Sequence, residues 1–168
     1  QYITKNTNSI VVLDADALNS IAGDPSILKG AKAQVVITPH IGEMARLTGM
    51  TVEQVSSRQE EAARAFACEY GCVTVLKSHR TVVAAPDGTL WINTTGNAAL
   101  AKGGSGDVLA GMIASFAAQG LEAAAAAICA VWVHGFAADR LVRRMSQYSV
   151  LARDLIGEIP FALKALGL

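Results

Sequence analysis

The sequence predicts an α/β fold in which a mostly parallel sheet carries helices on both faces. Short runs of branched apolar residues occur at residues 10–13 and 35–37, and residues 73–76, with the sequence VTVL, form another predicted strand. Such runs are typical of parallel strands buried on both faces, because the alternation with polar residues is then lost. Longer stretches with helical spacing of apolar residues lie between and after them. We expect one domain over residues 1–168, since this length supports a substantial single core.

The composition favours a protein whose partners are small molecules. Hydrophobic residues make up 52% of the chain and charged residues 17%, and 14 Lys and Arg balance 14 Asp and Glu. A net charge of zero argues against nucleic acid and anionic membranes as partners, since both are bound through clustered Lys and Arg. The longest apolar run, residues 123–133, is shorter than the roughly 18 residues that span a bilayer. Alanine dominates this run, which favours a closely packed core helix.

Three cysteines, Cys68, Cys72 and Cys129, form no C-x-x-C pair. We expect them to be buried, reduced thiols of a cytoplasmic protein. The first residues lack the apolar core of a signal peptide. Because the chain starts at Gln1 rather than at Met, and almost directly before a strand, we interpret it as a fragment or a processed chain.

Acidic residues follow the first predicted strand. Asp14 and Asp16 come directly after residues 10–13. Ligands of open parallel sheets gather beyond the carboxyl ends of the strands, so both carboxylates are placed to meet a substrate or a metal ion. Aspartate is also a good helix cap, and for Asp16 we favour a cap of the short helix that reaches Ile21.

The second predicted strand ends in residues 38–43, with the sequence TPHIGE. Proline stiffens this loop, glycine permits the turn, and a helix follows with Glu43 near its positive end. His40 is thereby held at the ligand-binding edge of the sheet, which makes it a candidate contact residue, although most lone histidines are structural. A scaffold helix is then predicted from a capping box at Thr51 to about Tyr70.

The third predicted strand, residues 73–76, leads through a polar turn into a β meander. Strands are expected at residues 82–85 and 90–92, separated by a turn that contains Pro86 and Gly88. The first turn carries a cationic cluster, which on its own is also compatible with ordinary solvated turn residues. The cluster consists of Lys77, His79 and Arg80.

A glycine-rich stretch at residues 96–111 leads into a helix with an apolar stripe. A helix start presents unpaired N–H groups and a partial positive charge, and glycine permits close approach, so this stretch is a candidate phosphate site. The spacing matches neither a P-loop nor Gly-x-Gly-x-x-Gly. Asp107, at the helix start, is either an N-cap or a group with a chemical task.

Two helices complete the chain. An alanine-rich helix is predicted from Glu122 to about Arg144, and within it we interpret His134 as a core histidine. A terminal helix is predicted over residues 149–168, interrupted at Pro160.

Three segments, in the same order, resemble the ADP/ATP-dependent NAD(P)H-hydrate dehydratases of the ribokinase-like superfamily. They are LDADALN at residues 13–19, TPHIGE at 38–43 and GNAALAKGGSGDVLAG at 96–111. The resemblance extends over residues 11–166 and implies a ribokinase-like three-layer sandwich with a β meander at one edge of the sheet. Family members carry a further N-terminal portion, so the resemblance also implies that residues 1–168 are the C-terminal major part of such a domain.

The resemblance implies repair of a damaged cofactor. ADP or ATP would phosphorylate the ring hydroxyl of hydrated NADH or NADPH, and loss of phosphate would restore the dinucleotide. Asp107 would take the proton from this hydroxyl, and Mg²⁺ would neutralise the nucleotide phosphates, although no carboxylate cluster identifies its ligands. A cytoplasmic homo-oligomer is expected.

The resemblance also implies two groups of binding residues. Those implied for the hydrated dinucleotide are His40, Gly42, Glu43, Arg46, Asn97 and Asp107. Those implied for the adenine nucleotide are Lys77, Ser78, His79, Arg80, Thr81, Gly103, Gly104, Ser105 and Gly106. Ser78 stands where the family's Lys-Gly-x-x-Thr-Val loop has glycine, so we expect a less free approach of the backbone to the nucleotide.

Two other functions are compatible with the sequence. A ribokinase-like kinase for a small alcohol, such as a hydroxyethylthiazole or a hydroxymethylpyrimidine, would use the same anion site and base, and residues 38–43 favour the dehydratase over it. The other is a fragment that binds nucleotide without catalysis, because nothing before Ile10 supplies the opening strands and the Gly-rich substrate loop of the family. The histidine in residues 38–40 favours the ADP-using bacterial kind.

Overall fold

The computed structural model describes residues 2–168. Its helices and strands alternate along the first half of the chain, and helices alone make up the end. In chain order they are α1 (Tyr2–Asn6), β1 (Ile10–Leu13), α2 (Asp16–Ile21), the 3₁₀ helix η1 (Pro25–Leu28), β2 (Gln34–Ile37), α3 (Ile41–Thr48), α4 (Val52–Ser57), α5 (Gln59–Tyr70), β3 (Val73–Leu76), β4 (Val82–Ala84), β5 (Leu90–Ile92), the 3₁₀ helix η2 (Ala98–Leu100), α6 (Ser105–Ala118), α7 (Ala123–Leu141) and α8 (Ala152–Ala165).

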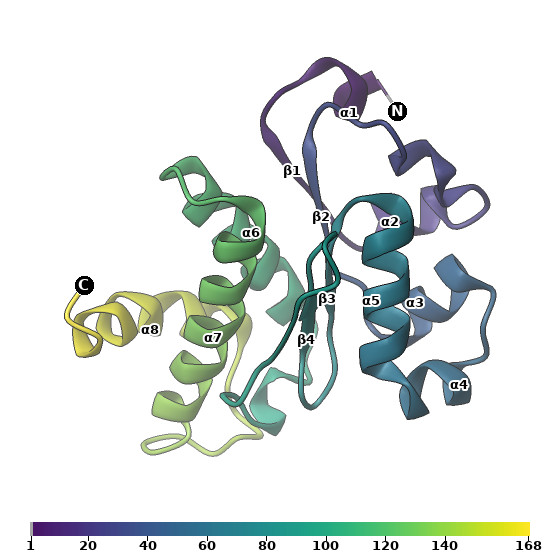
Figure 1. The fold of residues 1–168 in the computed structure, drawn as a ribbon. Coiled ribbons are helices and arrows are strands. Elements are labelled where there is room, and N and C mark those ends of the chain that lie inside the picture. Colours follow the sequence, from purple (N-terminus) through teal and green to yellow (C-terminus); the bar gives the residue numbers. More distant parts are fainter. Residues whose placement is uncertain (1) are drawn as a thin grey trace.

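A five-stranded sheet in the order β1-β2-β3-β4-β5 forms the middle layer (Figure 1). β1 pairs parallel to β2 and β2 parallel to β3, whereas β3–β4 and β4–β5 are antiparallel. The parallel pairs need helical crossovers, and the antiparallel pairs are joined by short turns. The predicted mostly parallel sheet with a meander at one edge is confirmed.

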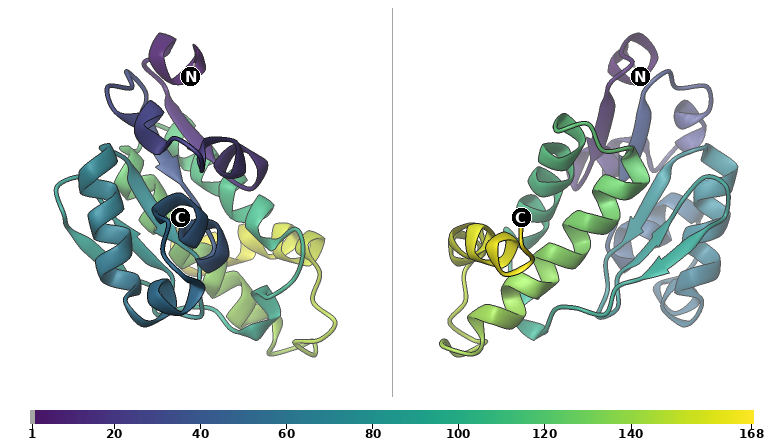
Figure 2. Two further views of the ribbon diagram at one scale, coloured as in Figure 1. Left: turned by 90° about the vertical axis from the view of Figure 1, so that its right-hand side faces the viewer. Right: turned by 60° about the vertical axis from the view of Figure 1, so that its left-hand side comes forward.

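Helices cover both faces of this sheet, as Figures 1 and 2 show. Successive residues of β2 point to opposite faces: Val35 and Ile37 pack in one core with residues of α2, α3 and α5, whereas Val36 packs in another with α6 and α7. Each face therefore needs apolar residues, which explains the unbroken apolar runs. The three-layer sandwich predicted from the sequence is confirmed.

Residues 51–70 form two helices rather than the predicted single one. The capping box is present, since the Thr51 hydroxyl accepts the Gln54 N–H and the Gln54 side chain accepts the Thr51 N–H. Arg58, at φ −133° and ψ 43°, lies outside the helical region and separates α4 from α5. The sequence between the capping box and Tyr70 contains no glycine or proline that would indicate this break.

Helix α8 continues through Pro160, so the predicted interruption is wrong. Proline removes the N–H that would bond to the carbonyl of Ile156, one turn earlier. Ile156 is 58% exposed, so this carbonyl lies on the solvent side of the helix, where water can replace the lost bond. Glu158, 1% exposed, anchors α8 through ion pairs with Arg140 of α7 and with Arg144, which follows this helix.

The alanine-rich helix α7 is a core helix. By length and composition, it is the one helix of residues 2–168 that could cross a membrane. It packs against β2, β3, β4, α6 and α8, however, and Ala126, Ala127 and Ala130 are fully buried. Small side chains allow this close approach of the helix to its neighbours.

The cysteines are only partly buried. All three are free, Cys72 is buried, and burial raises the pKa of its thiol to about 12. Cys68 and Cys129 are exposed, which contradicts the expectation of three buried thiols. They lie on exposed positions of α5 and α7, where a small thiol needs no packing partner.

His134 is a buried histidine, as predicted, and gives a testable pH dependence. Its Nε2 lies 3.3 Å from the Ser105 hydroxyl, and burial lowers its pKa from 6.5 to about 4. Between these values the unfolded chain binds the proton and the folded chain does not, so the free energy of unfolding falls as the pH falls through this window. We expect a loss of about 3 kcal/mol relative to a His134→Gln variant, measured by urea unfolding from pH 7 to pH 4. Parallel curves for the two proteins would contradict this assignment.

Candidate functional site

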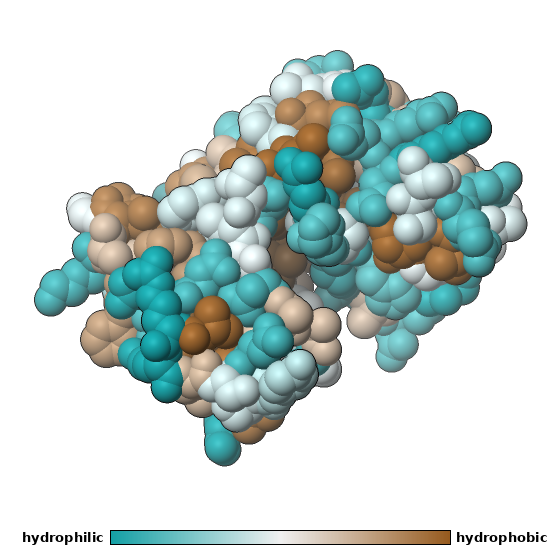
Figure 3. Space-filling model, turned by 90° about the horizontal axis from the view of Figure 1, so that it is seen from below, coloured by the Kyte–Doolittle hydropathy of each residue, from teal (hydrophilic) through white to brown (hydrophobic). Residues whose placement is uncertain are grey.

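The carboxyl ends of the three parallel strands meet at one edge of the sheet. His40, after β2, and Lys77, after β3, form a parallel β-bridge beyond the strands, and the Lys77 N–H donates to the Pro39 carbonyl at 2.8 Å. Asp14 follows β1 directly. Figure 3 views the molecule from below Figure 1, the side on which β3 ends, and shows a surface hollowed between two lobes.

A cluster of three charged side chains lies at this edge. The Lys77 Nζ is 2.7 Å from Asp14 Oδ1 and 4.0 Å from Glu43 Oε2. A Cβ atom on Gly106 would lie 3.5 Å from the Lys77 Nζ and 3.6 Å from Asp14 Oδ2. The first turn of α6 therefore packs directly against the ion pair, and the structure brings Lys77 and the glycine-rich turn together.

The glycine-rich turn leaves several amides unpaired. Helix α6 begins after Gly104, which adopts the left-handed conformation at φ 87°. The N–H groups of Gly103, Gly104, Gly106 and Asp107 donate no hydrogen bond within residues 2–168. The Ser105 N–H is engaged, since it donates to the Lys102 carbonyl at 3.3 Å. The turn can thus hold an anion through its glycine amides and the helix dipole. The Ser105 N–H does not contribute, because it already donates to the Lys102 carbonyl.

Asp107 is not a helix cap, so that alternative is wrong. It lies in the first turn inside α6, Gly104 is the N-cap, and no side chain caps this helix. The Asp107 side chain is exposed. The Asp107 carboxylate is thus placed beside the unpaired amides, where it can accept a proton.

His40 caps helix α3, a role that the sequence did not reveal. Its Nδ1 accepts the N–H groups of Gly42 (3.0 Å) and Glu43 (3.2 Å), and Glu43 Oε2 accepts the His40 N–H at 2.8 Å. This is a capping box with histidine in place of serine or threonine. Because Nδ1 accepts, the ring proton of neutral His40 lies on Nε2. Nε2 lies 3.6 Å from Glu43 Oε1, and the side chain is 55% exposed, so a ligand can also reach Nε2.

Gly42 leaves room for this cap, because a Cβ there would lie 3.0 Å from the His40 ring, closer than an ordinary van der Waals contact. The same Cβ would lie 3.9 Å from Arg46 Nη1, which places Arg46 on the same side. Arg46 Nε donates to the Asn19 side chain at 3.1 Å. Gly42 and Arg46 thus lie around the His40 ring, as the predicted site requires.

The strand β1 ends in an unusual turn. The cap of α2 is Ala15, without a side-chain hydrogen bond, and Asp16 is the first residue of the helix, so the predicted Asp16 cap is wrong. Ala15 has φ 48° and ψ −116°, and within residues 2–168 no other non-glycine residue has a positive φ. Strained backbone of this kind concentrates at functional sites.

Helix α7 fixes the loop that precedes the glycine-rich turn. Asp139 accepts hydrogen bonds from the Gly96 N–H and the Asn97 side chain, both at 2.8 Å, and the Thr95 hydroxyl donates to a main-chain carbonyl of α7. The Asn97 Oδ1 accepts the Ala99 N–H. Both polar ends of Asn97 are thus engaged inside the protein. Sequence reasoning missed Asp139, because it lies 42 positions after Asn97 and has no local motif.

The turn after β3 is held by Ser78. Its hydroxyl donates to the Arg80 carbonyl at 3.0 Å and accepts the Arg80 N–H at 3.2 Å, and the Thr81 hydroxyl donates to the Ser78 carbonyl. Because Ser78 does not adopt a positive φ, the turn forms without the glycine of the family loop.

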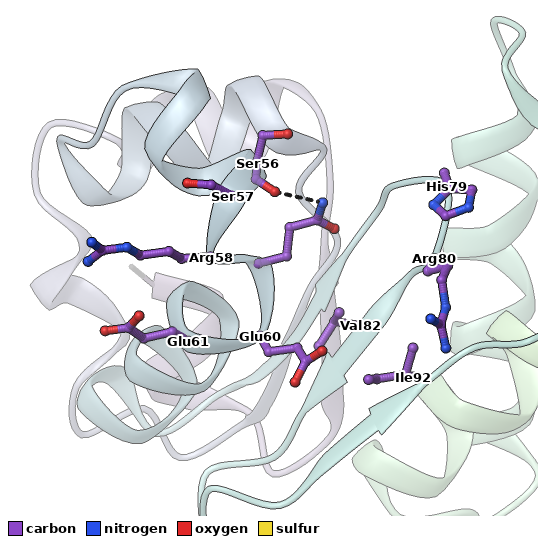
Figure 4. Close-up of a pocket in the computed structure, with 10 residues that line it drawn as sticks. Ser56, Ser57, Arg58, Glu60, Glu61, His79, Arg80, Val82 and Ile92 are labelled. Atoms are coloured by element: carbon purple, nitrogen blue, oxygen red, sulfur yellow. Dashed lines mark hydrogen bonds between the residues drawn. The ribbon is translucent and has the colours of Figure 1, made fainter.

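His79 and Arg80 border a separate cavity of about 430 Å³. Figure 4 shows them on the side of the meander, across from the junction of α4 and α5 with Arg58 and Glu61. Lys77 does not line this cavity. The residues implied for the nucleotide therefore divide between the ion-pair cluster and this cavity.

The described residues do not form a magnesium site on their own. Within residues 2–168, no three His, Cys, Asp or Glu side chains are arranged to hold a metal ion. Two of the carboxylates at the site, Asp14 and Glu43, approach the Lys77 ammonium.

Comparisons with known proteins agree with the resemblance. The sequence model of the NAD(P)H-hydrate dehydratase family matches residues 1–161. An ADP-dependent (S)-NAD(P)H-hydrate dehydratase from Neisseria meningitidis is 42% identical over 167 residues, which are 98% of this chain and 55% of that protein. The bifunctional NAD(P)H-hydrate repair enzyme Nnr of Moorella thermoacetica is 45% identical over 155 residues, which are 92% of this chain and 29% of that protein.

Solved structures lead to the same family. The ADP/ATP-dependent NAD(P)H-hydrate dehydratase from Bacillus subtilis, co-crystallised with ATP/Mg²⁺ and soaked with CoA, has a TM-score of 0.87 and 34% identity, and the match covers 97% of this chain and 58% of that one. A ribokinase from Thermotoga maritima, with a TM-score of 0.51 and 18% identity, shares the fold. The chain spans about half the length of the monofunctional relatives that it matches. It belongs to the NAD(P)H-hydrate dehydratase family, with the ribokinase-like fold.

Proposed function

We propose that this chain carries the phosphoryl-transfer site of an ADP- or ATP-dependent NAD(P)H-hydrate dehydratase. The substrate is hydrated NADH or NADPH, and the product is the intact dinucleotide. Membership of the family supports the substrate class. The observation that carries the proposal is the set of unpaired amides at the start of α6, with Lys77 beside them and Asp107 in the same turn.

The proposed chemistry has two steps. The ring hydroxyl of the substrate attacks the terminal phosphorus of the nucleotide, the bond from this phosphorus to the bridging oxygen breaks, and Asp107 accepts the hydroxyl proton. The C–O bond to phosphate then breaks and the adjacent ring carbon gives up a proton to solvent, which restores the double bond. The amides of Gly103, Gly104 and Gly106 and the Lys77 ammonium hold the transferring group, which is the main contribution a protein makes to this reaction.

His40 is proposed as a contact to the nicotinamide part. The α3 cap fixes its ring through Nδ1, so Nε2 is presented in one orientation. Mg²⁺ is proposed to arrive with the nucleotide phosphates, since magnesium usually keeps several waters and binds few protein groups. A homo-oligomeric state and a cytoplasmic location remain predictions.

An assay that offers the candidate substrates one at a time tests the proposal. The purified protein is offered hydrated NADH with ADP or with ATP, and separately hydroxyethylthiazole and hydroxymethylpyrimidine with the same nucleotides. We expect formation of NADH together with phosphate, and no nucleotide consumption with either alcohol. Nucleotide consumption with an alcohol alone would establish the small-alcohol kinase instead. Nucleotide binding without turnover of any substrate would establish a non-catalytic module.

A further inference from the structure

We propose that Asp14 is a positioning residue, which holds the Lys77 ammonium against the first turn of α6 so that an incoming nucleotide phosphate meets a fixed positive charge. The inference rests on the proposed function and adds a residue to its site. Asp14 would act through Lys77 and would not touch the reacting atoms.

Lys77 needs such a partner. A lysine ends in a compact charge on a flexible four-carbon stem, so its ammonium samples many positions unless another group holds it. The Asp14 Oδ1 lies 2.7 Å from Nζ, whereas the second carboxylate, Glu43 Oε2, is at 4.0 Å. The shorter contact, with Asp14, is the one that sets the direction of the lysine.

The Lys77 ammonium lies next to the proposed phosphate site, the first turn of α6. A Cβ on Gly106 would meet both members of the pair, Lys77 Nζ at 3.5 Å and Asp14 Oδ2 at 3.6 Å. The Lys77 and Asp14 side chains are 22% and 15% exposed, so solvent screens the pair only in part. The ammonium is therefore fixed beside amides that have no partner within residues 2–168.

Asp14 is itself held in place. The Leu13 carbonyl before it accepts the Thr38 N–H at 3.1 Å, and its own carbonyl accepts the Ala17 N–H at 3.0 Å. Directly after Asp14 the chain passes through Ala15 in its positive-φ conformation. An alanine adopts this conformation at a cost in free energy, and the turn that it makes keeps Asp14 at the end of β1.

A positioning role for Asp14 and a simple effect of its charge predict opposite changes in nucleotide affinity when Asp14 is replaced, which makes the proposal testable. The negative charge of Asp14 by itself repels a phosphate, so its removal would tighten nucleotide binding if charge alone mattered. If Asp14 positions Lys77, its removal weakens binding. A double-mutant cycle separates the two, since residues that act through one another are not additive.

The experiment measures ADP binding by isothermal titration calorimetry for the purified wild-type protein and its variants. The variants are Asp14→Ala, Asp14→Asn, Lys77→Met, the double variant Asp14→Ala/Lys77→Met, and the control Glu69→Ala. Glu69 forms a comparable pair with Lys29 at 3.3 Å, but on the surface and with both side chains about half exposed. The control thus matches Asp14→Ala in the charge that it removes.

We expect Asp14→Ala to raise the Kd for ADP about tenfold and Asp14→Asn to raise it less, because asparagine still offers Lys77 an acceptor. The double variant should bind no more weakly than Lys77→Met alone, and Glu69→Ala should bind as the wild type does. Thermal unfolding of each variant identifies any that fails to fold, and Asp14→Asn then serves in place of Asp14→Ala. Unchanged or tighter binding of ADP by a folded Asp14 variant, or full additivity with Lys77→Met, would overturn the proposal.

The same data separate this inference from the proposed function. A wild-type protein that binds ADP but forms no NADH contradicts the proposed dehydratase, while the binding cycle still decides the role of Asp14. A wild-type protein that does not bind ADP contradicts both.

Discussion

Replacement of Asp107 by asparagine should abolish turnover, with a loss of at least about a thousandfold, while ADP binding stays close to that of the wild type. Asparagine has nearly the same shape but cannot accept the proton of the substrate hydroxyl. The Asp107 side chain makes no hydrogen bond or ion pair within residues 2–168, so the substitution removes no internal interaction. Steady-state formation of NADH from hydrated NADH, with calorimetry for ADP, measures both quantities.

Glu122→Gln is the matched control for this variant. Glu122 is exposed, lies at the start of α7 and makes no capping hydrogen bond, so the change removes the same charge near a helix start away from the glycine-rich turn. Its turnover should equal that of the wild type. Near wild-type turnover in Asp107→Asn would remove Asp107 from the mechanism.

Substitution of Gly135 by alanine should destabilise the protein by about 2 kcal/mol or more and lower its activity. A Cβ at this position would lie 2.3 Å from the Thr95 hydroxyl and 2.7 Å from the Thr95 carbonyl group, distances at which the chain must shift. Thr95 belongs to the loop that Asp139 fixes ahead of the glycine-rich turn. The shift is therefore expected to reach the amides that hold the phosphoryl group. Urea unfolding and the dehydratase assay measure the two effects.

A second glycine gives the opposite expectation. Gly157 is exposed inside α8, and apart from its chain neighbours and the backbone of its own helix no atom lies within 4 Å of a Cβ built on it. Alanine there should stabilise the protein by about 0.5–1 kcal/mol, because it restricts the unfolded chain and favours helix. If Gly135→Ala proved as stable as Gly157→Ala, the close packing of Thr95 on α7 would not be the reason for glycine at position 135.

The layers and the sheet could be predicted because burial on two faces leaves a mark in the sequence. The apolar runs in β1 and β2 have no alternation, β3 has Thr74 as its one polar residue, and each strand is followed by a polar residue at the sheet edge. The break at Arg58 and the continuity through Pro160 could not be predicted, because both depend on solvent and tertiary contacts at one turn rather than on periodicity. Propensity describes a helix without its surroundings.

The site could be predicted in its parts but not in its connections. The sequence placed His40 at the ligand-binding edge of the sheet, and the resemblance assigned Lys77 and the glycine-rich turn to one nucleotide. The partners of these residues were not visible: His40 is held by its own helix, and Asn97 is held by Asp139 from a helix far along the chain. Hydrogen bonds between distant segments depend on side-chain geometry, which spacing does not encode.

The contact between Lys77 and Asp14 also bears on how the protein folds. The two residues are 63 positions apart, so they meet only after β1, β2 and β3 have aligned. Loops of this size close slowly, and a partly folded chain that lacks one of these strands cannot present the pair. A nucleotide can bind here only when the three strands are in place. Saturating ADP should therefore raise the melting temperature of the protein, and the sheet should unfold as a single cooperative unit.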